Sequence, residues 1–411
     1  MHKRSEFQKL LAASFISQTG SHFLTLALVA FVLYSSGSPV QSALIFVVSF
    51  LPSILVSAGL GNWVDRNISR WLIARNELLS IIATLLSGLS IALHMPLVLL
   101  CVILGFRSLL MFVSRAAATK WLKVITPPEL QTNRIKLFYL GFFLSTAFSG
   151  ILAGLVLSRA SIWAIVGLDA ASYLLGVAII MTLKPLVQIQ APYPAAQVVP
   201  PPSLRQTLST IFQMPAVRTS FLIVCLSQAL FQGAYSALVS YLPIQLFKIG
   251  LGGVGSFQVA ASIGITGGFV VNWLRGALLS EKKPTLPIRA MGLAAAAIFA
   301  LLLSVMTTSL PISLGGFLVL NLAYECVWLH HSSEFFRAAP KSDAARYQFT
   351  LSACAAFLMS ASTLAYSAGI QYFGTTIGVS VVLALGVVIS LIVPFVAQRP
   401  GVLSNLERTP S

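Results

Sequence analysis

Long apolar stretches separated by short polar connections run along the whole chain. A helix needs about 20 mostly apolar residues to cross the ~30 Å hydrocarbon core of a bilayer. Twelve stretches meet this requirement, and the short connections between many of them predict antiparallel neighbouring helices. The predicted spans are residues 10–34, 41–61, 72–93, 97–114, 137–158, 162–183, 219–242, 253–275, 286–307, 311–331, 347–371 and 375–396.

The longest connection, residues 184–218, has six predicted spans before it and six after it. It is Pro-rich and nearly free of charge in its first part, which is typical of a linker. Its second part predicts a short amphipathic helix on the inner membrane surface, because four apolar residues recur at i, i+4, i+7 and i+8. These residues are Leu204, Leu208, Ile211 and Phe212. The predicted domains are therefore a bundle at 1–183, a cytoplasmic linker at 184–218, and a second bundle with a short tail at 219–411.

Composition agrees with a membrane protein, because only 9% of the residues are charged and 57% are hydrophobic. A soluble domain carries roughly a quarter charged residues. The net charge of +16 has a topological cause. Twenty-three Lys and Arg residues lie in the termini and even-numbered connections or in the adjoining ends of the spans, against two, Arg159 and Lys248, on the opposite side. The positive-inside rule then predicts a multi-pass protein with both termini in the cytoplasm, and we expect its membrane to be the bacterial inner membrane. No basic cluster on a soluble face indicates a nucleic-acid partner.

The sequence holds no motif for cofactor, metal or enzyme chemistry. The four cysteines lie inside apolar runs and form no CxxC pair, so we interpret them as small buried hydrophobes. No GxxxxGK[ST], HExxH or GxSxG is present. We therefore expect no cofactor, no metal and no enzymatic activity. The apolar run near the N-terminus is too long for a signal sequence, so it is expected to be retained as the first helix.

The two halves of the chain resemble each other weakly. "PELQTNR" follows the fourth span and "PKSDAAR" follows the tenth, 212 residues later. Gly61-x-x-x-Asp65 has a counterpart in Gly268-x-x-x-Asn272. Related six-helix halves with a binding site between them are a transporter architecture.

The connection "GNWVDRNISRW" (Gly61 to Trp71) is unusually rich in charge for this chain. Together with twelve spans in a six-plus-six arrangement, its GxxxDRxxxR pattern resembles the major facilitator superfamily. "VITPPELQTNRIKLFYLG" and "LDAASYLLG" resemble segments of the macrolide- and siderophore-exporter branch, whose members are drug:proton antiporters. The resemblance implies an all-α polytopic fold with two pseudo-symmetric six-helix bundles, working as a monomer.

The resemblance also assigns a cytoplasmic gate to Gly61, Asp65, Arg66 and Arg70. The glycine would let two helix ends approach closely. Asp65 would pair with an Arg or cap a neighbouring helix N-terminus. The alternative is that the cations only obey the positive-inside rule, which explains Arg66 equally well but Asp65 less well, because acids contribute little to topology.

Two departures weaken the antiport expectation. The family usually has Gly where Ile68 stands and a cation where Ser69 stands. The antiporter signature GPxxGG in the fifth span is here "SGILAG", Ser149 to Gly154, without its Pro.

Polar residues inside the spans are candidates for function, because they are costly in hydrocarbon. In the superfamily, spans 1, 4, 7 and 10 line the central cavity, and the polar residues here fall on those spans. The candidate substrate-cavity residues are Gln18, Arg107, Gln228, Gln232, Tyr235, Asn321, Tyr324 and Trp328.

Glu325 and His22 are the candidates for proton coupling. Burial favours the neutral form of a carboxyl group, so Glu325 could carry a proton, attract a cationic substrate, or be a hydrogen-bonded structural residue. His22 titrates near neutral pH, but a lone His on a helix is more often structural. Arg107 cannot release its proton. It would bind an anion, pair with Glu325, or form a fixed structural ion pair.

Two further acids are expected to be structural: Asp169 through packing or capping, and Glu77 through Arg70 or Arg75. The main hypothesis is a secondary exporter of an amphiphilic small molecule, a drug, a siderophore or another metabolite, in exchange for protons. The alternatives are a metabolite importer, a lysophospholipid flippase, or a transport-inactive sensor or assembly protein.

Overall fold

A computed structural model describes residues 2–50, 63–64, 67, 69–157, 159, 161–184, 204–278, 287–339 and 344–397. Every regular element in this part of the chain is a helix. Contacts divide the chain into two compact units. The first comprises Met1–Gln197 and Val239–Ile263, and the second comprises Val198–Leu238 and Gly264–Ser411. The predicted boundaries at 183 and 219 stay a prediction.

The helices overlap the predicted spans, but several of them begin or end well outside the predicted bounds. Up to residue 184 they are α1 (His2–Ser36), α2 (Pro39–Val48), α4 (Arg70–Ala92), α5 (Leu97–Ile125), α6 (Pro128–Val156) and α7 (Ile162–Met181). From residue 204 they are α8 (Leu204–Gln213), α9 (Pro215–Ser227), η2 (Gln228–Gln232), α10 (Gly233–Tyr241), η3 (Leu242–Leu246), α11 (Gly250–Leu278), α12 (Pro287–Met306), α13 (Leu310–Ala338), α14 (Ala344–Phe373) and α15 (Thr375–Ala397).

Membrane-spanning character is visible in helix length and composition. Among the described residues, eight helices are long and apolar enough to cross a bilayer, and four shorter apolar helices accompany them. Each of the twelve predicted spans overlaps one of these helices, although residues 51–61 of the second predicted span lie outside the described residues. Exposed Leu, Ile, Val and Phe side chains are numerous on their outer faces. Such surfaces are stable in lipid but not in water, so the chain is a multi-span membrane protein.

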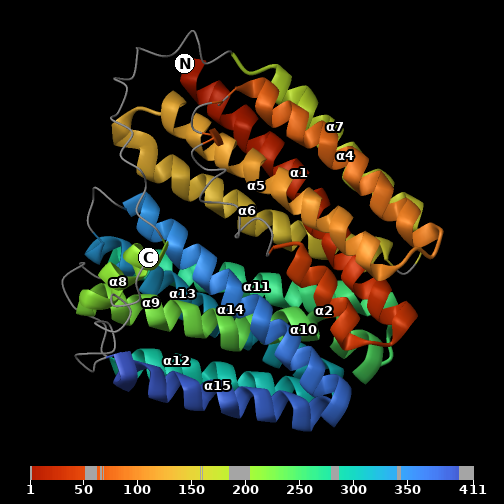
Figure 1. Ribbon diagram of the computed structural model, residues 1–411, viewed down its shortest axis with the longest axis vertical. Coiled ribbons are helices and arrows are strands. Elements are labelled where there is room, and N and C mark those ends of the chain that lie inside the picture. Colours follow the sequence, from red (N-terminus) through yellow and green to blue (C-terminus); the bar gives the residue numbers. More distant parts are fainter. Residues whose placement is uncertain are drawn as a thin grey trace, which may run out of the picture. The chain divides into compact units, whose positions relative to one another are not determined.

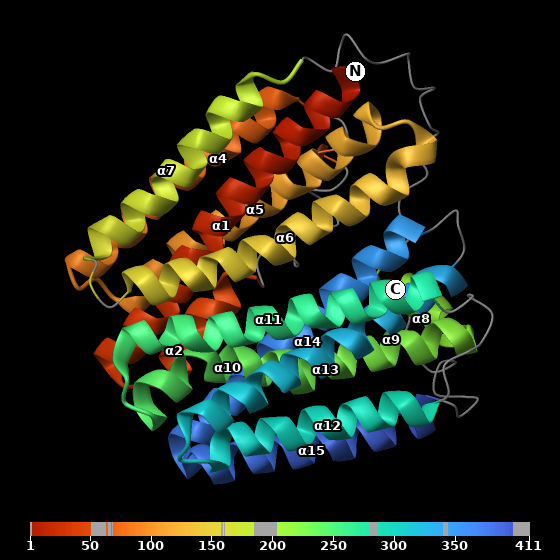
Figure 2. The ribbon, with the colours of Figure 1, turned by 180° about the vertical axis from the view of Figure 1, so that it is seen from behind.

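In the first unit, α1 packs against α6 and α7, while α4 packs against α5 and α7 (Figures 1 and 2). Serine caps start two of these helices. Ser69 accepts a hydrogen bond from the Leu72 amide at 3.0 Å, and Ser161 accepts one from the Ala164 amide at 3.3 Å. These side chains satisfy amides that would otherwise lack partners at the first turn. Ser69, which departs from the family pattern, therefore has a structural role as a helix cap.

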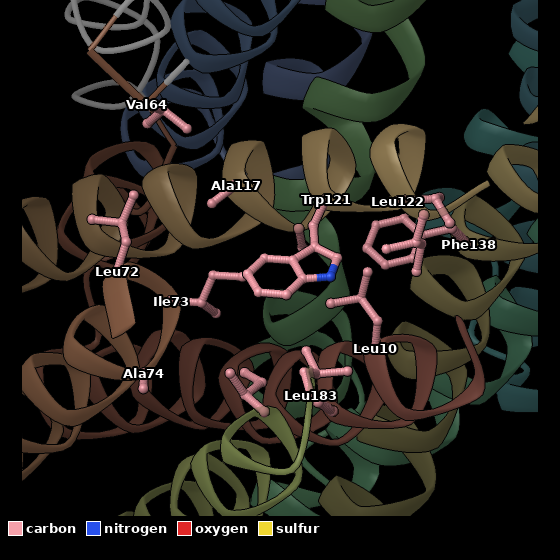
Figure 3. Close-up of a cluster of buried hydrophobic side chains, with 14 of the residues drawn as sticks. Leu10, Val64, Leu72, Ile73, Ala74, Ala117, Trp121, Leu122, Phe138 and Leu183 are labelled. Atoms are coloured by element: carbon pink, nitrogen blue, oxygen red, sulfur yellow. The ribbon is translucent and has the colours of Figure 1, made fainter. Parts of the chain in front are cut away.

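An apolar core formed by the first turns of α1 and α4, the second half of α5, part of α6 and the end of α7 surrounds the fully buried indole of Trp121 (Figure 3). Ile73, Leu10 and Phe138 belong to the same cluster. Large aromatic side chains contribute strongly to such cores through the area they bury. This core sets the spacing of the helices whose polar residues are described below.

Helix α5 continues well past the predicted end of the fourth span at residue 114. Nothing breaks the helix before Pro127, because the intervening residues include Ala116, Ala117 and Ala118, which favour helix. Arg115, which the sequence placed in a cytoplasmic connection, therefore lies on a helix inside the first unit.

The SGILAG segment brings α6 close to the first half of α11. A Cβ on Gly255 would lie 2.0 Å from the Gly154 Cα, and a Cβ on Gly150 would lie 2.5 Å from the Gln258 Cγ. Side chains at these glycines would force the helices apart, so the small residues permit close backbone packing. The segment has this packing function without the proline of the antiporter signature.

In the second unit, α12 packs beside α13, and α14 beside α15 (Figure 2). A core cluster joins α9, α13 and α14 through Phe221, Phe335 and Tyr347. The predicted amphipathic helix is confirmed as α8. Ile211 is fully buried in this cluster, and Leu208 and Phe212 pack against it, so the apolar face of α8 packs on the second unit. Its expected position on the inner membrane surface stays a prediction.

Candidate functional site

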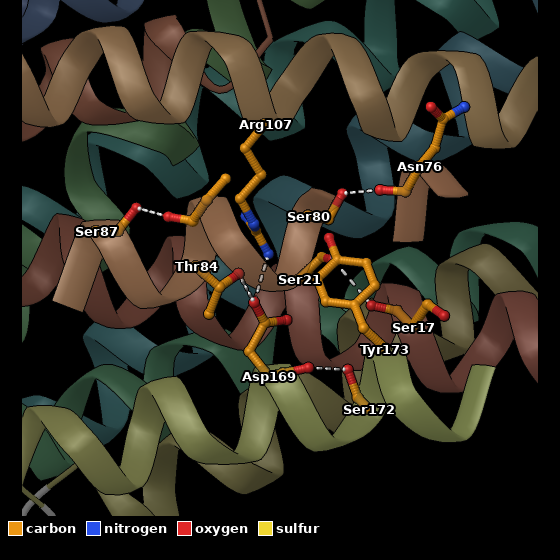
Figure 4. Close-up of polar contacts among 11 residues, drawn as sticks. Ser17, Ser21, Asn76, Ser80, Thr84, Ser87, Arg107, Asp169, Ser172 and Tyr173 are labelled. Carbon is orange, nitrogen blue, oxygen red and sulfur yellow. Dashed lines mark hydrogen bonds and ion pairs between the residues drawn. The ribbon is translucent and has the colours of Figure 1, made fainter. Parts of the chain in front are cut away.

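The polar centre of the first unit is a buried ion pair between α5 and α7. Arg107 Nη2 lies 2.8 Å from Asp169 Oδ2, and both side chains are almost inaccessible to solvent. Thr84 of α4 donates a second hydrogen bond to the same oxygen at 2.7 Å (Figure 4). Of the roles considered for Arg107, the structure shows an ion pair, and its partner is Asp169. Asp169 is thus more than a packing or capping residue.

Tyr173 extends this polar network along α7 (Figure 4). Its hydroxyl lies 2.8 Å from Ser21 Oγ on α1, and the Arg107 guanidinium carbon lies 5.6 Å from the centre of its ring. Gly20 on α1 permits this approach, because a Cβ there would lie 2.1 Å from Ser172 Oγ. Four helices are therefore held together by polar groups deep inside a membrane-spanning bundle.

Two adjoining pockets lie within the first unit and share Ser21, Met111 and Arg115. One lies between α1, α4, α5 and α7, and Gln18, Glu77 and Tyr173 also line it. The other is lined by residues that include His22 and Arg107. Each has a cavity volume of about 30 Å³, which is room for about one water molecule and far less than a small-molecule substrate needs.

Two predicted site residues of α1 line these pockets. Gln18 Oε1 accepts a hydrogen bond from Arg115 at 3.3 Å. His22 packs its ring edge-on to Phe142 at 5.1 Å, and its buried Nε2 has no hydrogen-bond partner among the described residues. The prediction that His22 takes part in proton coupling stays a prediction.

Glu77 was expected near Arg70 or Arg75, but the structure places it elsewhere. It is buried and lines the first pocket, whereas Arg75 is exposed and Arg70 bonds to backbone carbonyls. Sequence proximity misled here, because residues two apart on a helix face different directions.

Arg70 connects the start of α4 to the end of α7. Its Nη1 donates to the Leu183 carbonyl at 2.9 Å and to the Met181 carbonyl at 3.3 Å. Cations are favourable at a helix C-terminus, where carbonyl groups lack partners. Lys9 of α1 donates to the Thr182 carbonyl at 3.1 Å, and Glu6 accepts from the Lys184 amide at 2.9 Å. The remaining predicted gate residues, Gly61, Asp65 and Arg66, lie outside the described residues.

The second unit buries the other predicted proton-coupling residue, Glu325 of α13, at 3% exposure. Its Oε1 has no hydrogen-bond partner in the part of the chain that the structure describes. Gly268 of α11 gives it room, because a Cβ on that glycine would lie 2.6 Å from the Glu325 Cβ.

Several predicted cavity residues gather around the same helix. The Tyr324 hydroxyl bonds to Gln228 Oε1, and the Tyr235 ring stacks on Phe317 at 5.7 Å. The Asn321 side-chain amide donates to the Phe317 carbonyl one turn earlier on the same helix, at 2.8 Å. Gln232 is partly buried, and Trp328 packs against the core cluster of α9, α13 and α14.

The sequence did not predict that Gln228–Gln232 forms a π-helical turn, η2. The Leu230 carbonyl in this turn accepts a hydrogen bond from Tyr366 at 3.1 Å. Short π-helical segments are frequent at functional sites and change the register of the residues that follow. The predicted i, i+4, i+7 face of Gln228, Gln232 and Tyr235 is therefore interrupted, although Gln228 and Tyr235 both still contact α13.

Side chains that could bind a metal ion are scattered in the part of the chain that the structure describes. Among the described residues, no group of three or more His, Cys, Asp and Glu side chains converges. The four cysteines are free thiols.

Comparison with known proteins identifies the family. The residue pattern of the Major Facilitator Superfamily matches residues 10–363, most of the chain. The chain belongs to this superfamily. A search of curated protein sequences found no match.

Solved structures of similar fold cover nearly the full length. A POT family transporter in complex with 5-aminolevulinic acid gives a TM-score of 0.74 at 14% identity, covering 95% of this chain and 96% of that one. Another POT family transporter, in complex with a thioalcohol-conjugated peptide, gives a TM-score of 0.73 at 13% identity and covers 96% of each chain. A bacterial homolog of the human lysosomal transporter Spinster, inward-facing and occupied, gives a TM-score of 0.68 at 14% identity, covering 95% of this chain and 96% of that one.

At these identities the likeness shows the fold. Superfamily membership and these neighbours indicate a transporter rather than an enzyme, with a small-molecule substrate and a membrane location. The macrolide- and siderophore-exporter branch is not among the matches described, so that placement stays a prediction.

Proposed function

We propose that this superfamily member is a secondary active exporter of an amphiphilic small molecule, driven by exchange for protons. It works by alternating access in the bacterial inner membrane as a monomer, with both termini in the cytoplasm. Gly61, Asp65, Arg66 and Arg70 form its cytoplasmic gate. The substrate is a drug, a siderophore or a metabolite of similar amphiphilic character.

The observation that carries proton exchange is the environment of Glu325. This carboxyl group is buried in a membrane-spanning helix, and no cation is paired with it among the described residues. A lone carboxylate in such surroundings is strongly disfavoured unless it binds a cation or a proton. Glu325 is therefore suited to take up a proton when no cationic substrate group is present.

The residues beside Glu325 support an amphiphilic substrate. Tyr324 and Gln228 bond to each other, Tyr235 stacks on Phe317, and Trp328 packs against the core cluster. If these contacts open during transport, they would supply hydrogen-bonding groups and aromatic surface, the mixture that sites for drug-sized molecules use. The π-helical turn η2 places Gln228 where a small change of helix register would break its bond to Tyr324.

A proteoliposome assay tests this proposal. Purified protein is reconstituted with a trapped pH dye, a pH gradient is imposed, and macrolides, siderophores, lysophospholipids and short peptides are added in turn. A substrate should move against its gradient while protons move the other way. Glu325→Gln should abolish the coupled proton movement while leaving substrate binding measurable.

Glu334→Gln on the same helix is the matched control, because Glu334 is exposed and pairs with Arg337 at 3.1 Å. It should transport like the wild type. Flux without proton movement in the wild type would refute antiport and favour a uniporter. Movement of a compound with the proton gradient would indicate an importer, and lysophospholipid redistribution would indicate a flippase.

A further inference from the structure

Glu77 lies in a part of the first unit that the proposed coupling at Glu325 does not use. It is on the second turn of α4 with 6% exposure, and it faces the pocket between α1, α4, α5 and α7. The α1 wall of that pocket supplies the side chains of Ser14, Ser17, Gln18 and Ser21. A carboxylate thus lines an internal cavity whose other polar walls are mostly neutral hydroxyl and amide groups.

Two polar atoms in this pocket have no hydrogen-bond partner. Glu77 Oε2 and Ser17 Oγ are both buried, and neither has a partner with hydrogen-bond geometry within the described chain, although the two side chains are close enough to interact with each other. Both lie against Gly176 of α7, where a Cβ would be 3.5 Å from Glu77 Oε2 and 2.4 Å from Ser17 Oγ. The glycine therefore leaves space in which these two groups converge. Buried polar groups without partners are rare in native structures and mark places where a ligand or function accounts for them.

The charged side chains near Glu77 have partners other than Glu77. Arg107 of α5 pairs with Asp169 of α7, so that pair has no net charge. Arg115 of α5, in the same pocket, donates to Gln18. Tyr173 of α7 lines the pocket as well, and its hydroxyl bonds to Ser21. The ion pairs found among the described residues do not include Glu77.

A buried carboxylate with no directly bound cation reaches a stable state by binding one. The position of the Ser17 hydroxyl beside Glu77 suits a proton, because a protonated carboxyl group can donate a hydrogen bond to that oxygen. We infer that Glu77 is a second, exchangeable proton-binding site, located in the internal pocket of the first unit and separate from Glu325. This inference deepens the proposed proton-coupled transport and rests on it for its role in the cycle.

Infrared difference spectroscopy on the reconstituted full-length protein tests the site directly, without any substrate. Spectra are recorded across a pH titration for the wild type and for Glu77→Gln. The expected result is a carboxylic-acid C=O band that appears and disappears with pH in the wild type and is lost in Glu77→Gln. The same band should persist in Glu325→Gln and in Glu334→Gln.

Ser17→Ala is the second variant, in case Glu77→Gln does not fold. It keeps the carboxyl group but removes the hydroxyl beside it, so the band should remain and shift in frequency. A titration identical in wild type and Glu77→Gln would overturn the inference. An unchanged band in Ser17→Ala would also overturn it. Suppression of the band by added Na⁺ at constant pH would assign the site to sodium rather than to a proton.

The infrared test still applies if the protein transports nothing, because the titration needs neither a substrate nor flux. A titrating Glu77 in a protein that moves no substrate would support the site and count against the exporter. Transport coupled to protons with no Glu77 band would support the exporter and count against the site.

Discussion

Asp169 and Glu325 are both fully buried acids on membrane-spanning helices, but their surroundings differ. Asp169 Oδ2 accepts hydrogen bonds from Arg107 and Thr84, at 2.8 and 2.7 Å. Glu325 Oε1 has no partner among the described residues, and Gly268 of α11 lies against its side chain. One acid is paired with a fixed cation, and the other has no cationic partner among the described residues.

This difference separates two uses of a charge in a membrane. A paired acid holds helices together, and breaking the pair leaves an uncompensated charge in a low-dielectric interior. An unpaired acid contributes little to stability, and its value lies in the proton or ligand it can bind. Substitutions at the two positions should therefore affect stability very differently.

The largest effect is expected for Asp169→Asn, which leaves Arg107 buried without its counter-charge. The free energy of unfolding should fall by about 3–5 kcal/mol. Unfolding in mixed detergent micelles with increasing SDS measures it. The double variant Arg107→Met with Asp169→Leu should recover most of the loss. A double variant as unstable as the single one would show that the pair itself, rather than a lone charge, decides stability.

A smaller loss is expected for Gly268→Ala, because its Cβ would lie 2.6 Å from the Glu325 Cβ and 3.0 Å from the Leu322 carbonyl oxygen. Overpacking of this kind costs ~1–3 kcal/mol. The matched control is Gly315→Ala on α13, where nothing lies within 4 Å of the added carbon. The same unfolding assay should show the control unchanged or slightly more stable. Equal stability of both variants would contradict the close contact at Glu325.

Tyr324→Phe should have a still smaller effect, because it removes a single hydrogen bond to Gln228. Hydrogen bonds between membrane helices average about 0.6 kcal/mol in double-mutant cycles. A cycle with Gln228→Leu isolates the pair, and the second substitution should cost less once the first is present. Strictly additive losses would mean that the two side chains do not interact.

Glu325→Gln should have the smallest effect on stability, below the ~0.6 kcal/mol of a typical hydrogen bond between membrane helices. The amide has nearly the shape of the carboxyl group, and no bond is lost. The same SDS titration, run beside Asp169→Asn, provides the direct comparison. A loss as large as that of Asp169→Asn would reveal an essential structural partner for Glu325 and would count against its availability for protons.

The helices were predictable from sequence because their signal is local: about 20 apolar residues in a row are enough to define a span. The face shared by Asn321, Tyr324 and Glu325 also followed from helical spacing, and the structure buries all three. The end of α5 was predicted too early because Arg115 was counted among the cations of the following connection, whereas the helix continues to Ile125. A helix can carry such a cation when the cation faces a polar pocket.

Contacts between residues of different helices were harder to predict from the sequence. Arg107 and Asp169 are 62 residues apart, and the spacing along one helix does not reveal which helix lies opposite. Glu77 was misplaced for the same reason, since its neighbours come from α1 and α7 rather than from its own helix. The π-helical turn η2 depends on side chains such as Tyr366 that bond to its backbone from another helix.

The contacts of Glu6 and Lys9 with the end of α7 have a consequence for biosynthesis. Their partners lie 178 and 173 residues further along the chain. At the usual 5–20 residues per second of protein synthesis, the ribosome needs on the order of 10–35 s to make that stretch. The first helix must therefore remain in the membrane without these contacts until α7, the sixth predicted span, has been made. Chaperones or the insertion machinery have that interval in which to hold the chain's beginning.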